Sequence, residues 1–177
     1  MLDELIGSTL SRELIVIIIS ALPITELRGA LPLGIRLFQL PWYQAFFLAV
    51  IGNMLPVPFL LLFLQSLFKT IRRTDPGRRL VNSLLRHTRR HSAIVEKYGI
   101  IGLMLLVAVP LPGTGAWTGS MVAFLLGLSW HRALLSITVG VLVSGVIVTA
   151  LSLLGWGGVI IAGVGLVAIV LLGLWKA

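Results

Sequence analysis

The chain has 177 residues, of which 58% are hydrophobic and only 11% are charged, and its mean hydropathy is +1.06. Soluble domains carry roughly 25% charged residues, so this composition excludes a soluble surface and predicts an integral membrane protein. The absence of cysteine excludes thiol chemistry, and the net charge of +8 is concentrated in one segment, which argues against a nucleic-acid-binding face.

The first two apolar segments are each too short to cross a bilayer. They are Leu14–Leu22 and Ala30–Leu40, and a crossing needs about 20 apolar residues. The polar and helix-breaking residues between them are Pro23, Thr25, Glu26, Arg28 and Gly29. Two half-length segments joined in this way predict a re-entrant hairpin, whose irregular tip must be enclosed by protein or face a water-filled cavity.

The next segment, Trp42–Phe68, is long enough to span the membrane. Trp42 and Tyr43 at its start are typical of an interfacial anchor. Asn53, Pro56 and Pro58 predict a kink near its middle, because proline cannot donate a helical hydrogen bond.

A basic segment covers residues 69–97 and contains nine of the fourteen Lys and Arg residues, against two acidic ones. By the positive-inside tendency we expect it to be cytoplasmic. Its leucines and valines recur at helical spacing, which predicts an amphipathic helix on the inner leaflet. His87 and His91 lie four residues apart, but no third ligand is evident, so we predict no metal site.

The second half repeats the pattern of the first. The apolar segments Ile100–Val109 and Ala116–Leu128 are separated by a tip that contains Pro110, Pro112, Gly113, Thr114 and Gly115. Trp130–Leu154 is then long enough to span, and residues 158–175 form a final span.

Three pairs of identical residues, each pair 88 positions apart, relate the halves: Trp42 and Trp130, Ala45 and Ala133, Gly52 and Gly140. We interpret residues 13–68 and 100–154 as two repeats, each a re-entrant hairpin followed by one transmembrane helix. Because one repeat begins outside and the other begins in the cytoplasm, the repeats are inverted, and their tips would meet near the midplane.

The predicted fold is therefore an all-α integral membrane protein with one membrane domain over residues 1–177 and an extra C-terminal transmembrane helix. The acidic N-terminal region is expected outside and Lys176 inside a plasma or inner membrane.

Glu26 and Arg28 are the only charged pair predicted deep in the membrane. Intramembrane ionisable residues cost at least about 2.5–3.5 kcal/mol on insertion scales, which makes them functional candidates by default. We expect Glu26 to exchange a proton during transport and Arg28 to contact an anionic head group. The alternative is a structural ion pair. Arg36 has two alternative roles: it extends a basic track towards the outer surface, or its side chain reaches out to the lipid head groups. Asn53 likewise either lines the cavity or bonds a neighbouring helix.

The motifs Glu26-Leu-Arg-Gly-Ala-Leu-Pro-Leu-Gly34 and Pro110-Leu-Pro-Gly-Thr-Gly-Ala-Trp117 resemble those of the small multi-drug export protein family. The resemblance covers nearly the whole chain. That family is distantly similar to the DedA, or VTT-domain, membrane proteins, which carry paired re-entrant hairpins and include members that move polyprenyl-phosphate or phospholipid. The DedA pattern has charged residues in both halves, whereas the second tip here has none.

Together these features predict a small transporter that moves an amphiphilic, anionic substrate of the lipid-phosphate type between two hairpins, with proton coupling as an option. The alternatives are export of small hydrophobic cations and a non-transporting membrane scaffold. We expect membrane lipids as partners, and the glycine-rich last segment is compatible with a homo-oligomer. No catalytic residue, cofactor or nucleic-acid partner is predicted, so an enzyme is not expected.

Overall fold

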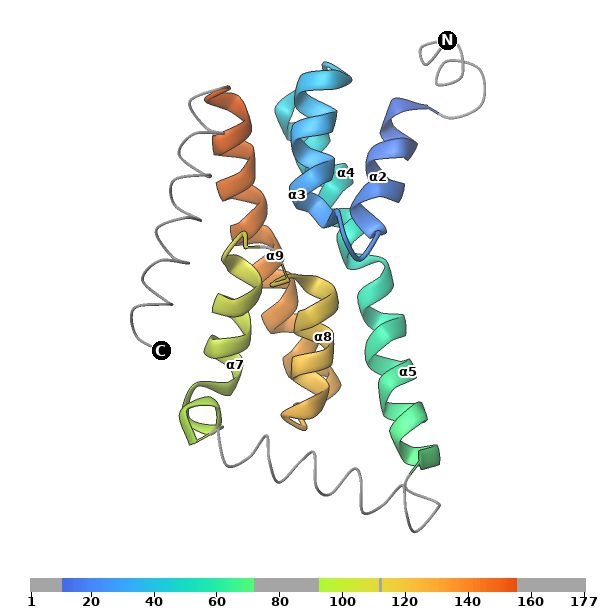
Figure 1. The fold of residues 1–177 in the computed structure, drawn as a ribbon, viewed down its shortest axis with the longest axis vertical. Helices are drawn as coiled ribbons and strands as arrows, with labels where there is room; N and C mark the ends of the chain where they lie inside the picture. The colour runs from blue at the N-terminus through green and yellow to red at the C-terminus, as the bar shows by residue number, and fades with distance from the viewer. Residues whose placement is uncertain (1–10, 72–92, 112, 156–177) are drawn as a thin grey trace. The chain divides into compact units, whose positions relative to one another are not determined.

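The computed structural model describes residues 11–71, 93–111 and 113–155, and every regular element among them is helical (Figure 1). This confirms the all-α prediction for the described residues. Most of the basic segment 69–97, the tip residue Pro112 and the predicted C-terminal span 158–175 lie outside them. The described chain divides into two compact units, one formed by residues up to Gly52 and from Gly145 onward, the other by Asn53–Ser144.

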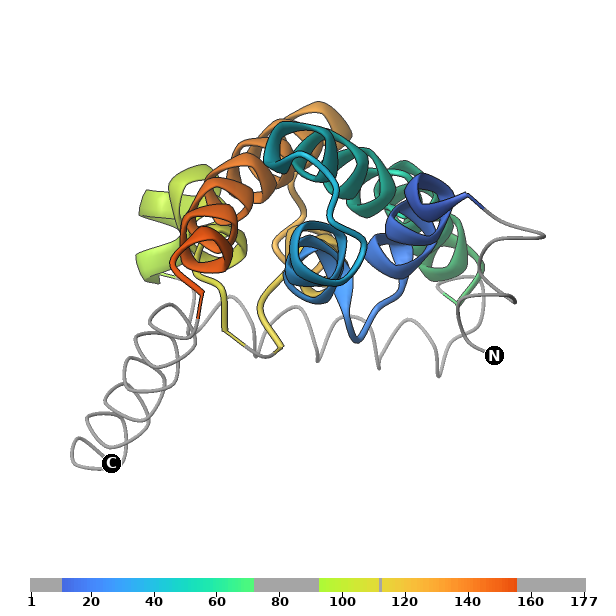
Figure 2. The ribbon, with the colours of Figure 1, turned by 90° about the horizontal axis from the view of Figure 1, so that it is seen from above.

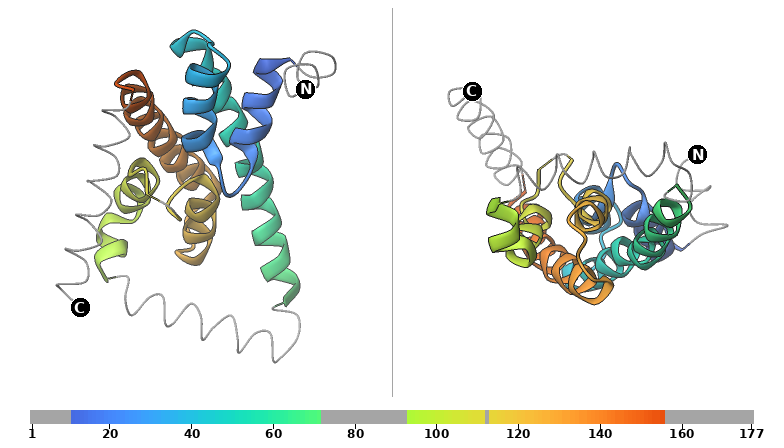
Figure 3. Two further views of the ribbon diagram at one scale, coloured as in Figure 1. Left: turned by 45° about the horizontal axis from the view of Figure 1, so that its top comes forward. Right: turned by 90° about the horizontal axis from the view of Figure 1, so that it is seen from below.

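The first unit contains a helical hairpin. Helix α2 (Arg12–Ala21) begins after Ser11, whose hydroxyl accepts a hydrogen bond from the Leu14 amide, and it ends just before Pro23. Helix α3 (Glu26–Pro32) then packs against α2, and the tight loop that joins them is visible in Figure 3.

The π-helical turn η1 (Leu33–Leu37) directly follows Pro32. Proline has no amide proton to donate to the carbonyl of Arg28, and this interrupts the regular α-helical pattern. The second apolar segment of the sequence, expected over Ala30–Leu40, therefore forms α3 and η1 together. It ends before Gln39, which has a φ of 54°.

Helix α4 (Trp42–Met54) packs closely on α2. A Cβ atom added to Gly52 would lie 2.9 Å from the Cα atom of Ile17 and closer still to the Ile17 carbonyl oxygen. The hydroxyl of Ser20 donates a hydrogen bond to the carbonyl of Ala49. Because backbone meets backbone at this crossing, the hairpin is held tightly against α4.

The second unit contains α5 (Pro56–Ile71), α7 (Ala93–Ala108), α8 (Ala116–Leu125) and the first part of α9 (Trp130–Leu153). Helix α8 lies between α5 and α7 in Figures 1 and 3 and contacts both. Gly119 of α8 and Gly140 of α9 make close approaches to α7. A Cβ atom would lie 2.6 Å from a methyl of Val107 at the first position and 2.8 Å from the Met104 carbonyl at the second.

Within residues 11–71, 93–111 and 113–155, two apolar helical stretches are long enough to cross a membrane, Trp42–Leu64 and Trp130–Leu153. The first is interrupted at Leu55, between α4 and α5, as the prolines predict. Helices α2, α3 and α8 are too short to span alone, as expected. Figure 2, seen from above, shows the long α9 together with the shorter helices.

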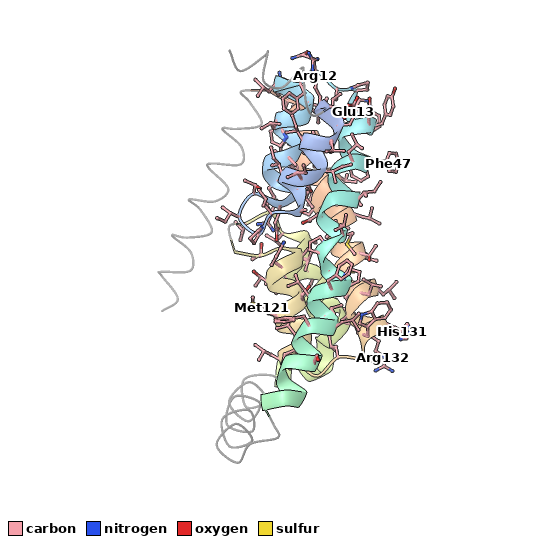
Figure 4. The ribbon with its side chains drawn as sticks, turned by 90° about the vertical axis from the view of Figure 1, so that its right-hand side faces the viewer. Arg12, Glu13, Phe47, Met121, His131 and Arg132 are labelled. Atoms are coloured by element: carbon pink, nitrogen blue, oxygen red, sulfur yellow. The ribbon has the colours of Figure 1, made fainter. Side chains whose placement is uncertain are left out.

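Polar and charged side chains lie at the ends of helices in each unit. Arg12 and Glu13 lie in the first turn of α2 in the first unit, and His131 and Arg132 lie in the first turn of α9 in the second, as Figure 4 shows. The helix middles carry apolar side chains such as Phe47, which is exposed. Exposed apolar helix middles with polar ends are the pattern that lipid requires.

Candidate functional site

The tip of the first hairpin is closed by main-chain and threonine hydrogen bonds. The Glu26 amide donates to the carbonyl of Leu22 at 3.1 Å, and the Thr25 hydroxyl donates to the carbonyl of Ile19 at 2.6 Å. Pro23 is exposed, and the neighbouring Ile24 is 94% exposed. Thr25 therefore fixes the loop to the end of α2 rather than offering a free hydroxyl.

Glu26 is the most unusual residue of this tip. It is only 6% exposed, and its φ of 47° lies in the left-handed region that non-glycine residues rarely adopt. Such a conformation costs of order 1–3 kcal/mol and persists only where the surroundings enforce it. The fold thus holds a buried carboxyl group at the first residue of α3 in spite of a local energetic cost.

Arg28 lies one residue beyond Leu27 on the same short helix and is half-buried. Its positive charge interacts with the carboxyl group of Glu26. The structure thus brings together the two charged residues that the sequence singles out. Gly29 keeps the helix start compact, because its amide donates to the Thr25 carbonyl at 3.0 Å and an added Cβ atom would lie 3.1 Å from that of Thr25.

The tip of the second hairpin follows α7 and includes Pro110, and it is closed in a comparable way. The hydroxyl of Thr114 lies 2.7 Å from the carbonyl oxygen of Val109 and 2.8 Å from that of Leu111. Gly113 has a φ of 81°, and Gly115 caps the start of α8 in an extended conformation. Among the described residues from 109 to 116, none carries a charge.

Arg36 is separated from the tip by the π-helical turn. Its Nε donates to the carbonyl of Ser152 at 2.8 Å and its Nη2 to that of Leu153 at 3.3 Å, so the guanidinium group caps the C-terminal end of α9. Gly155, with a φ of 67°, lies against this group, and a Cβ atom there would be 2.7 Å from Nη2. No sequence signal pointed to this contact, because its two ends lie more than a hundred residues apart.

Asn53, the fourth candidate residue, is fully buried near the end of α4. Neither its Oδ1 nor its Nδ2 has a hydrogen-bond partner among the described residues. The buried hydroxyls of Ser144 and Thr149 in α9 are likewise without one there, and sequence reasoning missed both. Leaving such a group unsatisfied costs about 1–3 kcal/mol, so these positions call for an explanation.

The described residues contain no group of three or more His, Cys, Asp or Glu side chains that could hold a metal ion. His87 and His91 lie outside the described ranges.

The comparison with known families gives one match. The family described as "Putative small multi-drug export protein" matches residues 26–147, which include Glu26, Arg28 and Gly29 of the first tip, the whole second tip, α4, α5 and most of α9. No curated protein and no solved structure matches the chain.

Proposed function

The chain belongs to the small multi-drug export family, and from that premise we propose that it is a membrane exporter whose substrate contacts the Glu26–Arg28 tip. The observation that carries this proposal is the buried, conformationally strained Glu26, whose carboxyl group interacts with Arg28, at the tip of a hairpin of short helices. Strained backbone and buried charge cluster at functional sites, because each costs free energy that the surrounding structure has to offset.

We propose an amphiphilic anion, such as a lipid phosphate, as the substrate. The guanidinium group of Arg28 supplies a planar fork of donors that suits a phosphate, while the exposed apolar side chains of the hairpin suit an acyl or prenyl chain. Ile24, at the tip itself, is the clearest of these. A hydrophobic cation would instead have to displace Arg28 from Glu26.

We also propose that the two halves are inverted repeats whose hairpins enter the membrane from opposite sides. Matching details in the two units support this idea. Thr25 and Thr114 each bond a carbonyl near the end of the preceding helix, and Gly52 and Gly140 each meet a backbone carbonyl of that helix. Inverted repeats in transporters place the substrate site near the midplane, with irregular backbone around it.

The distant similarity to DedA proteins, the cytoplasmic position of the basic segment and the oligomeric state stay predictions. The second tip offers backbone groups rather than charges to a substrate. The polar chemistry of recognition therefore rests on the first tip in this proposal.

Transport into liposomes tests the substrate. Purified full-length protein is reconstituted, and the movement of a fluorescent phospholipid- or polyprenyl-phosphate analogue is measured for wild type, Arg28→Ala and the control Arg132→Ala, an exposed residue at the start of α9. We expect Arg28→Ala to slow movement at least about tenfold and Arg132→Ala to leave it unchanged. Movement of a lipophilic cation but not of the phosphate analogue would replace the anion proposal with cation export.

The same vesicles test proton coupling. Glu26→Gln keeps the size and hydrogen-bonding capacity of the side chain but cannot exchange a proton. We expect wild type to respond to an imposed pH gradient and the variant to transport at the same rate with and without it. A gradient response that survives in Glu26→Gln would remove the carboxyl group from the coupling mechanism.

A further inference from the structure

The residue before α3 departs from the usual way in which a helix begins. A threonine at the N-cap normally has extended backbone, and its hydroxyl accepts a hydrogen bond from one of the first helical amides. Thr25 instead has helical backbone, with φ −84° and ψ −43°, and its side chain makes no such cap. Its hydroxyl donates to the carbonyl of Ile19 at 2.6 Å. The side chain best suited to cap α3 is therefore bonded to α2.

The bond from Thr25 replaces one that α2 lacks. In a regular helix the carbonyl of Ile19 would accept from the amide of residue 23, but Pro23 has no amide proton. The Leu22 amide donates to the same carbonyl at 3.3 Å, which is long for such a bond. The Thr25 hydroxyl thus supplies the shorter of two bonds at the end of α2 and fixes the loop there.

Thr25 is also bonded to α3, so it links the two helices of the hairpin. Its carbonyl accepts from the amide of Gly29 at 3.0 Å, and a Cβ atom added to Gly29 would lie 3.1 Å from the Cβ atom of Thr25. Glu26 is the next residue along the chain, and its own amide donates to the carbonyl of Leu22 at 3.1 Å. Together these bonds set the direction in which the Glu26 side chain leaves the main chain.

From these contacts we propose that Thr25 is a positioning residue for proton exchange at Glu26. Its bond to α2 keeps the Glu26 side chain buried and in electrostatic interaction with Arg28, and both conditions govern how readily a carboxyl group gains and loses a proton. This role rests on the proposed proton coupling at Glu26 and adds the residue that fixes the geometry of the exchange.

Other titratable groups of the first unit lie away from this tip. Among its described residues they occupy the first turns of α2 and α4 and the last turn of η1 (Figure 1). They are Arg12, Glu13, Tyr43 and Arg36. Arg28 is the charged side chain that acts on Glu26 from within the tip, so the local geometry that Thr25 sets is what a substitution would change.

The test compares matched variants of the two hairpins in the vesicles used for proton coupling. Thr25→Val keeps the shape of the side chain but removes the hydroxyl, whereas Thr25→Ser keeps the hydroxyl. Thr114→Val is the control, because it removes the corresponding bond to Val109 from the uncharged second tip. A general loss of stability would affect both valine variants alike.

The measured quantity is the ratio of the transport rates with and without a pH gradient. We expect this ratio to fall at least about threefold in Thr25→Val, as befits the loss of one hydrogen bond, and to keep its wild-type value in Thr25→Ser and Thr114→Val. If wild type responds to the gradient and Glu26→Gln does not, a wild-type ratio in Thr25→Val overturns the positioning role alone. If wild type and Glu26→Gln respond alike, the coupling role of Glu26 fails, and the positioning role fails with it.

Infrared difference spectroscopy of the purified full-length protein gives a readout that does not depend on the substrate. The carboxyl band that disappears in Glu26→Gln is followed against pH. We expect its midpoint to shift by about half a pH unit or more in Thr25→Val and to stay in place in Thr114→Val. Equal midpoints in wild type and Thr25→Val reject the positioning role. If Thr25→Val does not fold, Gly29→Ala takes its place, because its methyl group presses on Thr25 and leaves the hydroxyl intact, and an unchanged midpoint there has the same meaning.

Discussion

At the scale of single residues, Glu26 is the position where local preference and the folded structure conflict most. Its type and place in the tip could be read from the sequence, since an acidic residue between two short apolar segments is conspicuous. Its positive φ could not, because nothing about a glutamate favours the left-handed region. That conformation is imposed by the bond from its amide to Leu22 and by the start of α3.

The strain at Glu26 predicts an unusual order of stabilities. Glu26→Gly and Glu26→Ala both remove the carboxyl group, but only glycine tolerates a φ of 47° without cost. We expect the glycine variant to have the higher free energy of unfolding, by about 1 kcal/mol. Thermal unfolding in detergent measures the difference.

The control for this comparison is Ala30, a buried residue of the same helix with ordinary helical geometry. There, Ala30→Gly should lower stability by about 1 kcal/mol, as in any helix interior. The sign of the effect should therefore reverse between positions 26 and 30. Equal stability of the two Glu26 variants would show that the tip does not hold the strained conformation in solution.

At the scale of helices, the sequence predicted where helices begin and end better than it predicted which helices contact one another. The break before α3, the interruption at Leu55 and the two long apolar stretches all follow from proline positions and segment lengths. The contact of Arg36 with the end of α9 and the backbone approach at Gly52 depend on tertiary packing. Composition and periodicity carry no information about either contact.

The close approach of α4 to α2 at Gly52 predicts that a larger side chain there is destabilising. Gly52→Ala would push a methyl group into the backbone of Ile17, which cannot move aside as a side chain can. We expect a loss of about 2–3 kcal/mol in the free energy of unfolding. Gly99→Ala is the matched control, because its Cβ atom would lie 3.7 Å from Leu128, an ordinary contact, and should stabilise α7 slightly. A harmless Gly52→Ala would contradict the close approach.

The contact of Arg36 with the C-terminal end of α9 predicts that substitutions of Arg36 lower the stability of that helix end. A positive group at a helix C-terminus bonds terminal carbonyls and complements the helix dipole, whereas one at the N-terminus opposes it. Arg36→Gln should therefore destabilise the protein by about 1 kcal/mol, and Arg132→Gln, in the first turn of α9, should be neutral or slightly stabilising. Hydrogen exchange of the last turn of α9 should quicken in the first variant only.

At the scale of the whole molecule, the sequence predicted the helical class and the family, and the apolar surface supports a membrane location. Orientation and the inverted repeat stay predictions, because a helix long enough to span carries no mark of its direction. Direction is set by the charges of flanking segments, and most of those segments lie outside the described residues.

The natural absence of cysteine makes the orientation testable. A single cysteine at Ser83, in the basic segment, should react with a membrane-impermeant thiol reagent only after the cells are permeabilised. One at Ser8 should react in intact cells, as expected for an outside N-terminal region. Labelling of Ser83→Cys in intact cells would contradict the predicted topology. A reporter fused after Ala177 independently shows on which side of the membrane the C-terminal end lies.

The division into two units has a mechanical consequence. The chain passes between them twice, between Gly52 and Asn53 and between Ser144 and Gly145. The first passage lies beside a joint at Leu55, where two prolines have already removed helical bonds, whereas the second runs through the uninterrupted rod of α9. Missing backbone hydrogen bonds make a helix easier to bend. We therefore expect the chain to bend more readily at Leu55 than within α9.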